Sequence, residues 1–163
     1  MLMRWRIRAA LPHVQGRLLD IGCGTNELVQ RYGNGVGCDV HQWGNVDLVV
    51  EDSSNLPFDG VSFNTVTIIA ALNHIPNRAA VLVEAHRVLQ PGGWLIVTMI
   101  PPAISKIWHT VRAPWDADQH ERGMAVGETY GFDPAEVREL MRNAGFQIVL
   151  EQPFQLWINR VTV

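Results

Sequence analysis

The chain has 163 residues, a formal net charge of −3, and 47% hydrophobic against 18% charged residues. Its length suits one domain, and its apolar content excludes an intrinsically disordered chain. The acidic balance argues against general nucleic-acid binding, which depends on neutralising phosphates. No apolar run reaches the roughly 20 residues that a membrane span requires. We therefore expect a single domain over residues 1–163, with neither a nucleic-acid partner nor a membrane span.

The cysteines and the N-terminus exclude other classes. Cys23 and Cys38 are too few for a disulfide scaffold and lack the spacing of a zinc site, so no metal is expected. The basic N-terminus is interrupted by Pro12 and His13 before it can form the apolar core of a signal peptide. It is either an exposed first helix or a basic foot on an anionic surface. Without an export signal, a cytoplasmic location is expected.

Short apolar strands alternate with helical stretches along most of the chain. In chain order, strands are expected at 17–21, 36–40, 47–50, 63–72 and 94–100, and helices at 26–32 and 76–90. Continuous apolar strands that alternate with helices indicate a parallel sheet covered on both faces.

The C-terminal part departs from this alternation. Asp133 and Pro134 have the residue types of a helix N-cap and first position, and Gly145 ends the helix. The final strands, 146–151 and 156–163, are separated by four residues, too few for a parallel crossover, so they must pair antiparallel. The segment 101–131 fits no strand or helix pattern, and we expect a lid or insertion there.

A glycine-rich turn, Gly22-Cys23-Gly24, follows the first strand. Glycines permit a tight turn and a close approach by a ligand, and the amides at the following helix start favour an anionic group. Such a turn alone is a weak signal, because many doubly wound folds contain one for structural reasons.

Three carboxylates strengthen that signal. Asp20, Asp39 and Asp52 lie at or near the ends of the first three strands, where ligands of such sheets bind. Each alone could cap a loop. Asp39 stands where an acidic residue meets ribose hydroxyls. Asp20 would repel the pyrophosphate of NAD and suits a ligand with an ammonium or sulfonium group.

Several segments together resemble the class I S-adenosylmethionine-dependent methyltransferases of the small-molecule type 11 kind. The matching segments are 18–25, 36–40, 51–58, 84–93 and 143–146. The resemblance implies an α/β, Rossmann-like sheet of seven strands in the order 3-2-1-4-5-7-6, with strand 7 antiparallel and helices on both faces.

The resemblance also implies a cofactor, S-adenosylmethionine, with S-adenosylhomocysteine as its product. By motif position, the methionine part would meet Asp20 and the backbone of Gly22, Cys23 and Gly24. The adenosine part would meet Asp39 at the ribose, Val40 against the adenine, and Asp52 and Ser53 at its amino group. The carbonyl of Ala70 or Ala71 would meet the methionine ammonium.

The chain departs from the family pattern at two places in this region. The third glycine of the loop is replaced by Asn26, a residue type that commonly caps helices. Between Asp39 and Asp47 there is no room for the usual crossover helix, so this connection should be a loop and the adenine pocket more open.

Methyl transfer from a sulfonium is a direct displacement that needs mainly alignment of the reacting atoms. His74 follows the fourth strand and is either a general base or acceptor contact, or a loop-packing histidine. Trp108 and Trp115 either wall an acceptor pocket or anchor the lid to the core. The leading hypothesis is a methyltransferase with a small-molecule acceptor. The alternatives are a non-catalytic methyltransferase-like binding domain and, with Asp20 and the terminal hairpin against it, a nicotinamide-dependent oxidoreductase. The acceptor, the methylated atom and the oligomeric state are left open.

Overall fold

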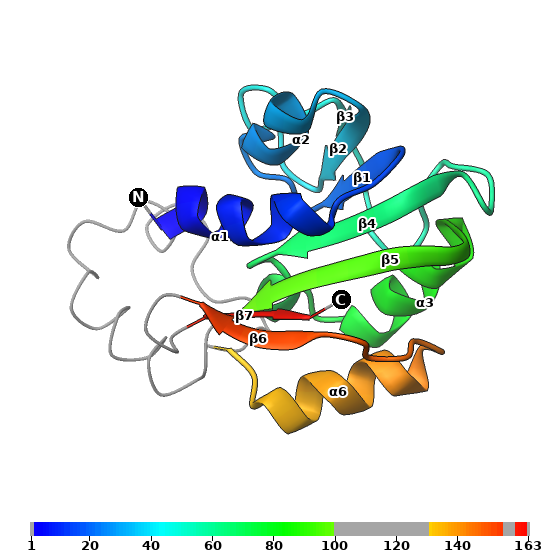
Figure 1. Cartoon of the computed structure of the whole chain (residues 1–163). Helices are drawn as coiled ribbons and strands as arrows, with labels where there is room; N and C mark the ends of the chain where they lie inside the picture. The colour runs from blue at the N-terminus through cyan, green and yellow to red at the C-terminus, as the bar shows by residue number, and fades with distance from the viewer. Residues whose placement is uncertain (1, 100–130, 155–158, 163) are drawn as a thin grey trace.

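A computed structural model describes residues 2–99, 131–154 and 159–162. Its architecture is an α/β, Rossmann-like sheet with helices on both faces (Figure 1). The expected α/β, Rossmann-like class, with a parallel sheet and helices on both faces, is therefore confirmed. The expected lid, with Trp108 and Trp115, lies outside the described residues except for Gly131.

Five strands form the parallel part of the sheet. They are β1 (Leu18–Ile21), β2 (Gly35–Asp39), β3 (Leu48–Val49), β4 (Phe63–Ile69) and β5 (Leu89–Met99), arranged as β3-β2-β1-β4-β5. The sheet continues through β7 (Asn159–Thr162), antiparallel to β5, and β6 (Glu151–Phe154), antiparallel to β7. The order of β1 to β5 places β1, β2 and β4 side by side at the centre.

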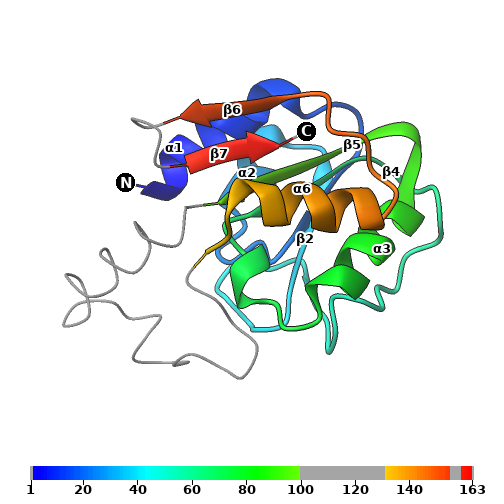
Figure 2. The same cartoon turned by 90° about the horizontal axis from the view of Figure 1, so that it is seen from below.

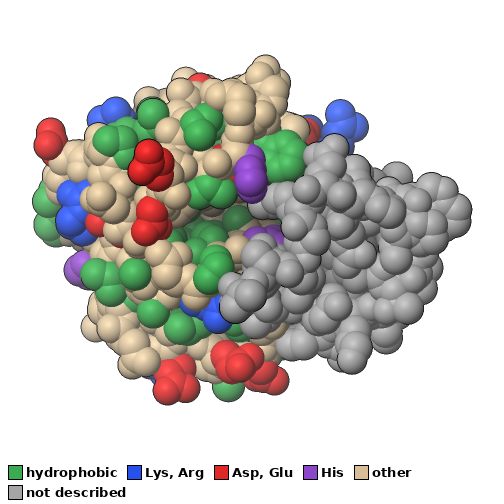
Figure 3. Space-filling view, turned by 180° about the vertical axis from the view of Figure 1, so that it is seen from behind, with side chains coloured by type: hydrophobic (Ala, Val, Ile, Leu, Met, Phe, Trp, Pro, Cys, Tyr) green, Lys and Arg blue, Asp and Glu red, His purple; other side chains and the backbone are tan. Residues whose placement is uncertain are grey.

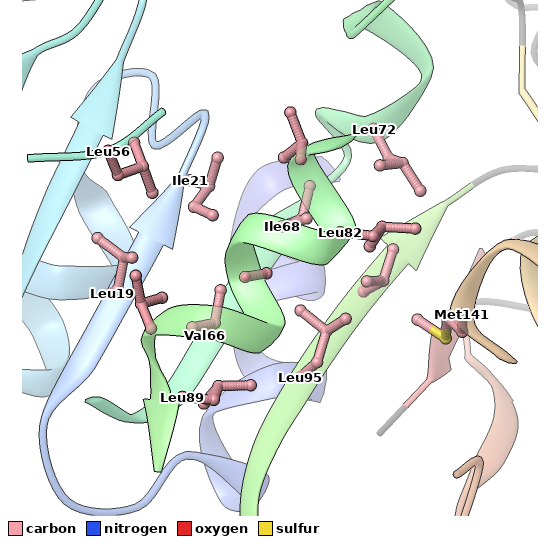
Figure 4. Packing of buried hydrophobic residues seen from close by; sticks show 14 of the residues in the cluster. Leu19, Ile21, Leu56, Val66, Ile68, Leu72, Leu82, Leu89, Leu95 and Met141 are labelled. Carbon is pink, nitrogen blue, oxygen red and sulfur yellow. The ribbon is translucent and has the colours of Figure 1, made fainter. Parts of the chain in front are cut away.

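The helices cover the two faces of this sheet. Helices α1 (Leu2–Ala10) and α2 (Glu27–Tyr32) pack on one face, and α3 (Arg78–Val88) and α6 (Pro134–Asn143) on the other (Figures 1 and 2). A short 3₁₀ helix, η1 (Leu11–His13), follows α1, and a second, η2 (Leu72–His74), follows β4. Each face has its own cluster of buried apolar side chains. Figure 4 shows the cluster beneath α3.

The alternation of side chains along β1 decides which groups reach which face. Leu19 and Ile21 belong to the cluster beneath α3, whereas Leu18 belongs to the cluster beneath α1 and α2. Asp20 shares the side of Leu18 and lines a small pocket with Met3 and Ile7 of α1. The sheet thus places this carboxyl beneath the first helix.

The start of α6 follows the expectation from sequence. The Asp133 carboxylate accepts from the Ala135 amide at 2.9 Å, and Glu136 accepts from the Asp133 amide at 2.9 Å. This reciprocal capping box satisfies amides that the helix itself cannot bond.

Three expected boundaries are wrong. The fifth strand begins at Leu89 rather than at residue 94, directly after α3. The fourth strand ends at Ile69 rather than Leu72, because Ala70 takes a left-handed conformation (φ +55°) and η2 follows. The first strand of the terminal hairpin begins at Glu151 rather than at residue 146, so Pro153 lies in a strand and not in a turn. This is compatible with β6 being an edge strand, since proline cannot donate to a second neighbour.

Candidate functional site

The glycine turn is tied to the neighbouring strands. The amides of Gly22 and Cys23 both donate to the carbonyl of Cys38, at 2.8 and 3.1 Å. Gly22 has φ +69°, and a Cβ there would lie 2.6 Å from the Cβ of Ala71. Both its conformation and its contact with the chain after β4 therefore require glycine. The turn brings three predicted site residues, Gly22, Cys23 and Ala71, together.

Gly24 marks open space in this turn. It has φ +54°, and nothing lies within 4 Å of the position a Cβ would occupy. Its amide donates to the Asp39 Oδ2 at 2.9 Å. The backbone here is accessible to a ligand, with a carboxylate beside it.

Asp39 lies at the end of β2 and is 6% exposed. In addition to the Gly24 amide, its carboxylate accepts from the His41 amide, Oδ1 to nitrogen 3.0 Å. Asp39 therefore orients both the glycine turn and the start of the connection to β3, while its remaining lone pairs can accept from hydroxyls.

Asp20 is the most perturbed carboxyl of the site. It is 2% exposed, and the Thr67 hydroxyl donates to its Oδ1 at 2.6 Å. The pKa of Asp20 is raised to about 7. Burial is the main cause, the Thr67 hydrogen bond opposes it, and the Asp39 charge adds to it. No cation among the described residues compensates this carboxyl.

Asp52 has a different environment. It is exposed, and it accepts from the Ser54 amide and hydroxyl, both at 2.8 Å, and from the Asn77 side chain at 3.0 Å. These hydrogen bonds lower the pKa of Asp52. The carboxylate thus caps its own loop and joins it to the segment after β4. Its neighbour Ser53 is buried.

The remaining predicted residues lie around the same edge of the sheet. Val40 is 43% exposed directly after β2. The strained backbone of Ala70 is held by a hydrogen bond from its amide to the Thr98 carbonyl at 3.0 Å. His74 ends η2, is half-buried, and its amide donates to the Ala71 carbonyl at 2.9 Å.

The two departures from the family pattern have separate outcomes. The connection from β2 to β3 contains no helix, as expected. Asn26 occupies the N-cap position of α2, but its side chain makes no capping hydrogen bond, so the expectation that it starts the helix in this way is wrong. The side chain is instead directed to the β2–β3 connection.

The sequence interpretation missed two features. Thr67 is a polar residue in an apolar strand. Thr65 stands two positions before it, so both polar side chains point to the same face of the sheet, and this was the available signal. Met3 and Ile7, which cover Asp20 from α1, carried no signal because an N-terminal helix can pack at many places.

The pocket at Asp20 also contains Gly22, Cys23 and Thr25. A larger open groove of about 760 Å³ lies between α3, β5 and α6, but no predicted site residue lines it. In the space-filling view, histidine and apolar side chains border a hollow beside the grey atoms (Figure 3). Among the described residues, no group of three or more His, Cys, Asp and Glu could hold a metal ion.

Comparison with known proteins shows relatives of similar sequence and fold. A family model described as a methyltransferase domain, Methyltransf_11, matches residues 19–97. Over these residues the chain is similar to a methyltransferase domain. A crystal structure from Thermotoga maritima, described as a SAM-dependent methyltransferase and possible histamine N-methyltransferase, superposes with a TM-score of 0.73. The two chains are 18% identical, over 98% of this chain and 88% of the other.

Curated relatives carry more specific names. A demethylmenaquinone methyltransferase from Staphylococcus epidermidis is 35% identical over 49% of this chain and 41% of its own. A ubiquinone/menaquinone biosynthesis C-methyltransferase, UbiE, from Desulfotalea psychrophila is 32% identical over 68% of this chain and 50% of its own. The chain thus spans half or less of the length of these relatives. In the part of the chain that the structure describes, no helix is long and apolar enough to cross a membrane.

Proposed function

We propose that this protein is an S-adenosylmethionine-dependent methyltransferase that acts on a small-molecule acceptor. The observation that carries this function is Asp20. A buried carboxyl that no described cation compensates lies beside a glycine turn and beneath α1. A ligand with a positive group complements such a site, whereas the pyrophosphate of a nicotinamide cofactor would be repelled.

The residues around Asp20 fit the cofactor as follows. The open backbone at Gly24, with Gly22 and Cys23, would hold the methionine part, together with a carbonyl of Ala70 or Ala71. Asp39 would accept from the ribose hydroxyls. Val40, Asp52 and Ser53 would lie at the adenine. Two observations support this placement of the cofactor. The residues share one edge of the sheet, and no atom lies within 4 Å of the position that a Cβ of Gly24 would occupy.

The chemistry requires little from the protein beyond alignment and exclusion of water. When bound, S-adenosylmethionine supplies an electrophilic methyl carbon on a sulfonium. Asp20 would orient the positive end of the ligand from below, and α1 would shield it from water through Met3 and Ile7.

For the acceptor we propose an aromatic hydroquinone that is methylated on a ring carbon. The names of the two curated relatives support this substrate class. A hydroquinone must lose a proton as its carbon attacks, and neutral imidazole can accept one near pH 7. We assign that role to His74, half-buried at the end of η2. The cytoplasmic location remains a prediction, which fractionation of cells would test.

One experiment tests the activity and the assignments together. Purified protein, S-adenosylmethionine and a soluble demethylmenaquinol analogue should yield S-adenosylhomocysteine and a C-methylated product, detected by mass spectrometry. Asp39→Ala should weaken cofactor binding by about tenfold or more, because hydrogen bonds to a charged acceptor are lost. His74→Ala should lower turnover by about 10²–10⁴ and leave cofactor affinity intact.

Asp59→Ala is the matched control, since Asp59 is an exposed aspartate outside the predicted site. Absence of cofactor binding to the unmodified protein would refute the proposed function. Binding without product for any acceptor would favour the non-catalytic alternative. Unchanged turnover in His74→Ala would remove the base assignment alone.

A further inference from the structure

The side chain of Asn26 makes an unusual connection. Asn26 is 1% exposed and has a left-handed backbone (φ 61°, ψ 24°), a conformation that glycine and asparagine tolerate best. Its side-chain nitrogen donates to the Asn45 carbonyl at 2.9 Å and to the Asp47 Oδ2 at 2.8 Å. Both acceptors belong to the connection between β2 and β3. Asn26 therefore bonds the glycine turn to a segment 19–21 positions further along the chain.

Asp47 completes a three-way junction. The same Oδ2 also accepts from the Gly37 amide of β2 at 2.8 Å, and the Asp47 amide donates to the Gly37 carbonyl at 3.2 Å. One carboxylate oxygen thus joins the glycine turn, the middle of β2 and the end of the connection. The junction lies at the point where a crossover helix would otherwise support the connection.

The atoms of this junction are tightly packed around Gly37. A Cβ at Gly37 would lie 2.0 Å from the Asn26 Oδ1 and 2.9 Å from the Cys23 Sγ, so any side chain there would displace Asn26. Among the residues that the structure describes, the buried Asn26 Oδ1 has no hydrogen-bond partner. Burying an unpartnered amide oxygen is unfavourable, and glycine at position 26 would avoid it. The two bonds from the Asn26 nitrogen must offset that cost.

The connection held by this junction begins with Val40, which we have placed at the adenine of the cofactor. Residues 40–46, which we call the crossover loop, begin directly after Asp39. Within the loop, backbone hydrogen bonds run from Trp43 to His41 and from Val46 to Trp43, the Gln42 side chain donates to the Trp43 carbonyl at 3.4 Å, and the His41 and Trp43 rings are 5.9 Å apart. These contacts lie within the loop. Its start is attached to the sheet by the His41 amide, which donates to Asp39, and its end is attached by Asn26 and Asp47.

We propose that Asn26 and Asp47 are positioning residues that replace the absent crossover helix and hold the crossover loop against the adenosine half of the cofactor. This inference rests on the proposed function, because it assigns the loop a place beside the adenine. Without the junction, the loop should sample more conformations, and the ligand would have to order it on binding.

The test compares Asn26→Gly, Asp47→Ala and the double variant with the unmodified chain. Glycine keeps the left-handed backbone and removes both side-chain hydrogen bonds. Asn45→Ala is the matched control, since the carbonyl that accepts from Asn26 stays in place. In the ligand-free proteins, amide hydrogen exchange of residues 37–47 should become about tenfold faster in both single variants and in the double variant. It should not change in Asn45→Ala or within β4.

Ligand affinity is the second measurement, because a general loosening of the fold would not change it in this pattern. Titration calorimetry should show S-adenosylhomocysteine and 5′-methylthioadenosine, which shares its adenosine half, weakened by the same factor of about ten in Asn26→Gly. The double variant should lose no more than the larger single loss, because both residues act through one junction. A loss confined to S-adenosylhomocysteine, additive losses, or unchanged exchange would each overturn the proposal.

Different results would refute the proposed function and the role of Asn26 and Asp47. If the unmodified chain binds neither ligand, the proposed function fails, and the role at the adenosine half fails with it. If the unmodified chain binds both and Asn26→Gly shows faster exchange but unchanged affinity, the junction is structural and only this inference is overturned. Should Asn26→Gly not fold, Asp47→Ala gives the same comparison, because it leaves the glycine turn unaltered.

Discussion

At the scale of single residues, the environment of Asp20 links the fold to the ligand. The carboxyl is buried because the β1 alternation directs it beneath α1, where Met3 and Ile7 exclude water. Burial favours the neutral form, which raises the pKa of Asp20 to about 7. A cationic ligand would favour the charged form and lower this pKa. Binding should therefore release a proton below pH 7, and Asp20 couples cofactor affinity to pH.

The same pKa predicts how stability depends on pH. With a pKa raised from 3.8 to about 7, folded Asp20 holds a proton between these values while the unfolded chain has released it. Stability should therefore fall as pH rises from about 4 to 7 and then level off, by an amount on the order of a few kcal/mol. Asp20→Asn should lose this part of the dependence. Urea unfolding of both proteins at pH 5, 6, 7 and 8 measures it.

Asp59→Asn serves as the control for that series and should keep the slope of the unmodified chain. Equal slopes for the unmodified chain and Asp20→Asn would show that Asp20 titrates at its ordinary pKa. In that case Asp20 would no longer indicate a ligand with a positive group.

At the scale of elements, α3 is fastened to the loop that precedes β4. Glu84 is 7% exposed, accepts from the Leu56 amide at 2.8 Å, and forms a two-pronged ion pair with Arg87, both oxygens at 2.7 Å. Arg87 in turn donates to the carbonyls of Leu56 and Phe58, at 3.3 and 2.9 Å. These contacts explain physically why glutamate and arginine stand three positions apart in the segment 84–93, which carried the resemblance.

Removing the Glu84 charge should therefore destabilise the whole loop. We expect Glu84→Gln to lower the free energy of unfolding by about 1–3 kcal/mol, since Arg87 loses its charged partner and one of its two acceptor oxygens, which a side-chain NH2 replaces. The hydrogen bonds from Arg87 hold the pKa of Glu84 below its usual value. The contribution is thus present above pH 4.5 and is lost as pH falls, so the two proteins should converge at low pH.

Urea unfolding at pH 7 and pH 3 checks this expectation, with Glu139→Gln as the control because Glu139 is exposed on α6. A constant difference between the proteins at both pH values would mean that packing, rather than the charge, is what Glu84 contributes.

Helices and strands were predictable from sequence where they depend on residues close by in the chain. The cap at Asp133 and the central strands depend on neighbouring residues and on apolar runs, and the sequence was sufficient for both. The end of β4 was missed because Ala70 adopts its left-handed backbone through a bond to Thr98 of β5, a contact 28 positions away. The role of Asn26 was missed for the same reason, since its partners lie on another segment.

At the scale of the whole molecule, the site depends on both faces of the sheet. Asp20 and Thr67 face α1, whereas the segment after β4 continues into α3 on the opposite face. The proposed cofactor site lies where β1, β2 and β4 end, so a ligand there would contact loops that belong to both layers. Binding should consequently stabilise the fold as a unit rather than one loop.

This coupling predicts a thermal shift that separates the competing functions. A ligand at 100 times its dissociation constant adds about 2.7 kcal/mol to the free energy of unfolding. For a chain of this size, each kcal/mol raises Tm by about 2–4 °C, so saturating S-adenosylhomocysteine should raise it by about 5–10 °C. NAD at the same concentration should leave Tm unchanged, because its pyrophosphate would face Asp20. Asp39→Ala, measured at the concentration that saturates the unmodified chain, should show a smaller shift. A larger shift with NAD than with S-adenosylhomocysteine would instead support the oxidoreductase alternative and refute the assignment of Asp20.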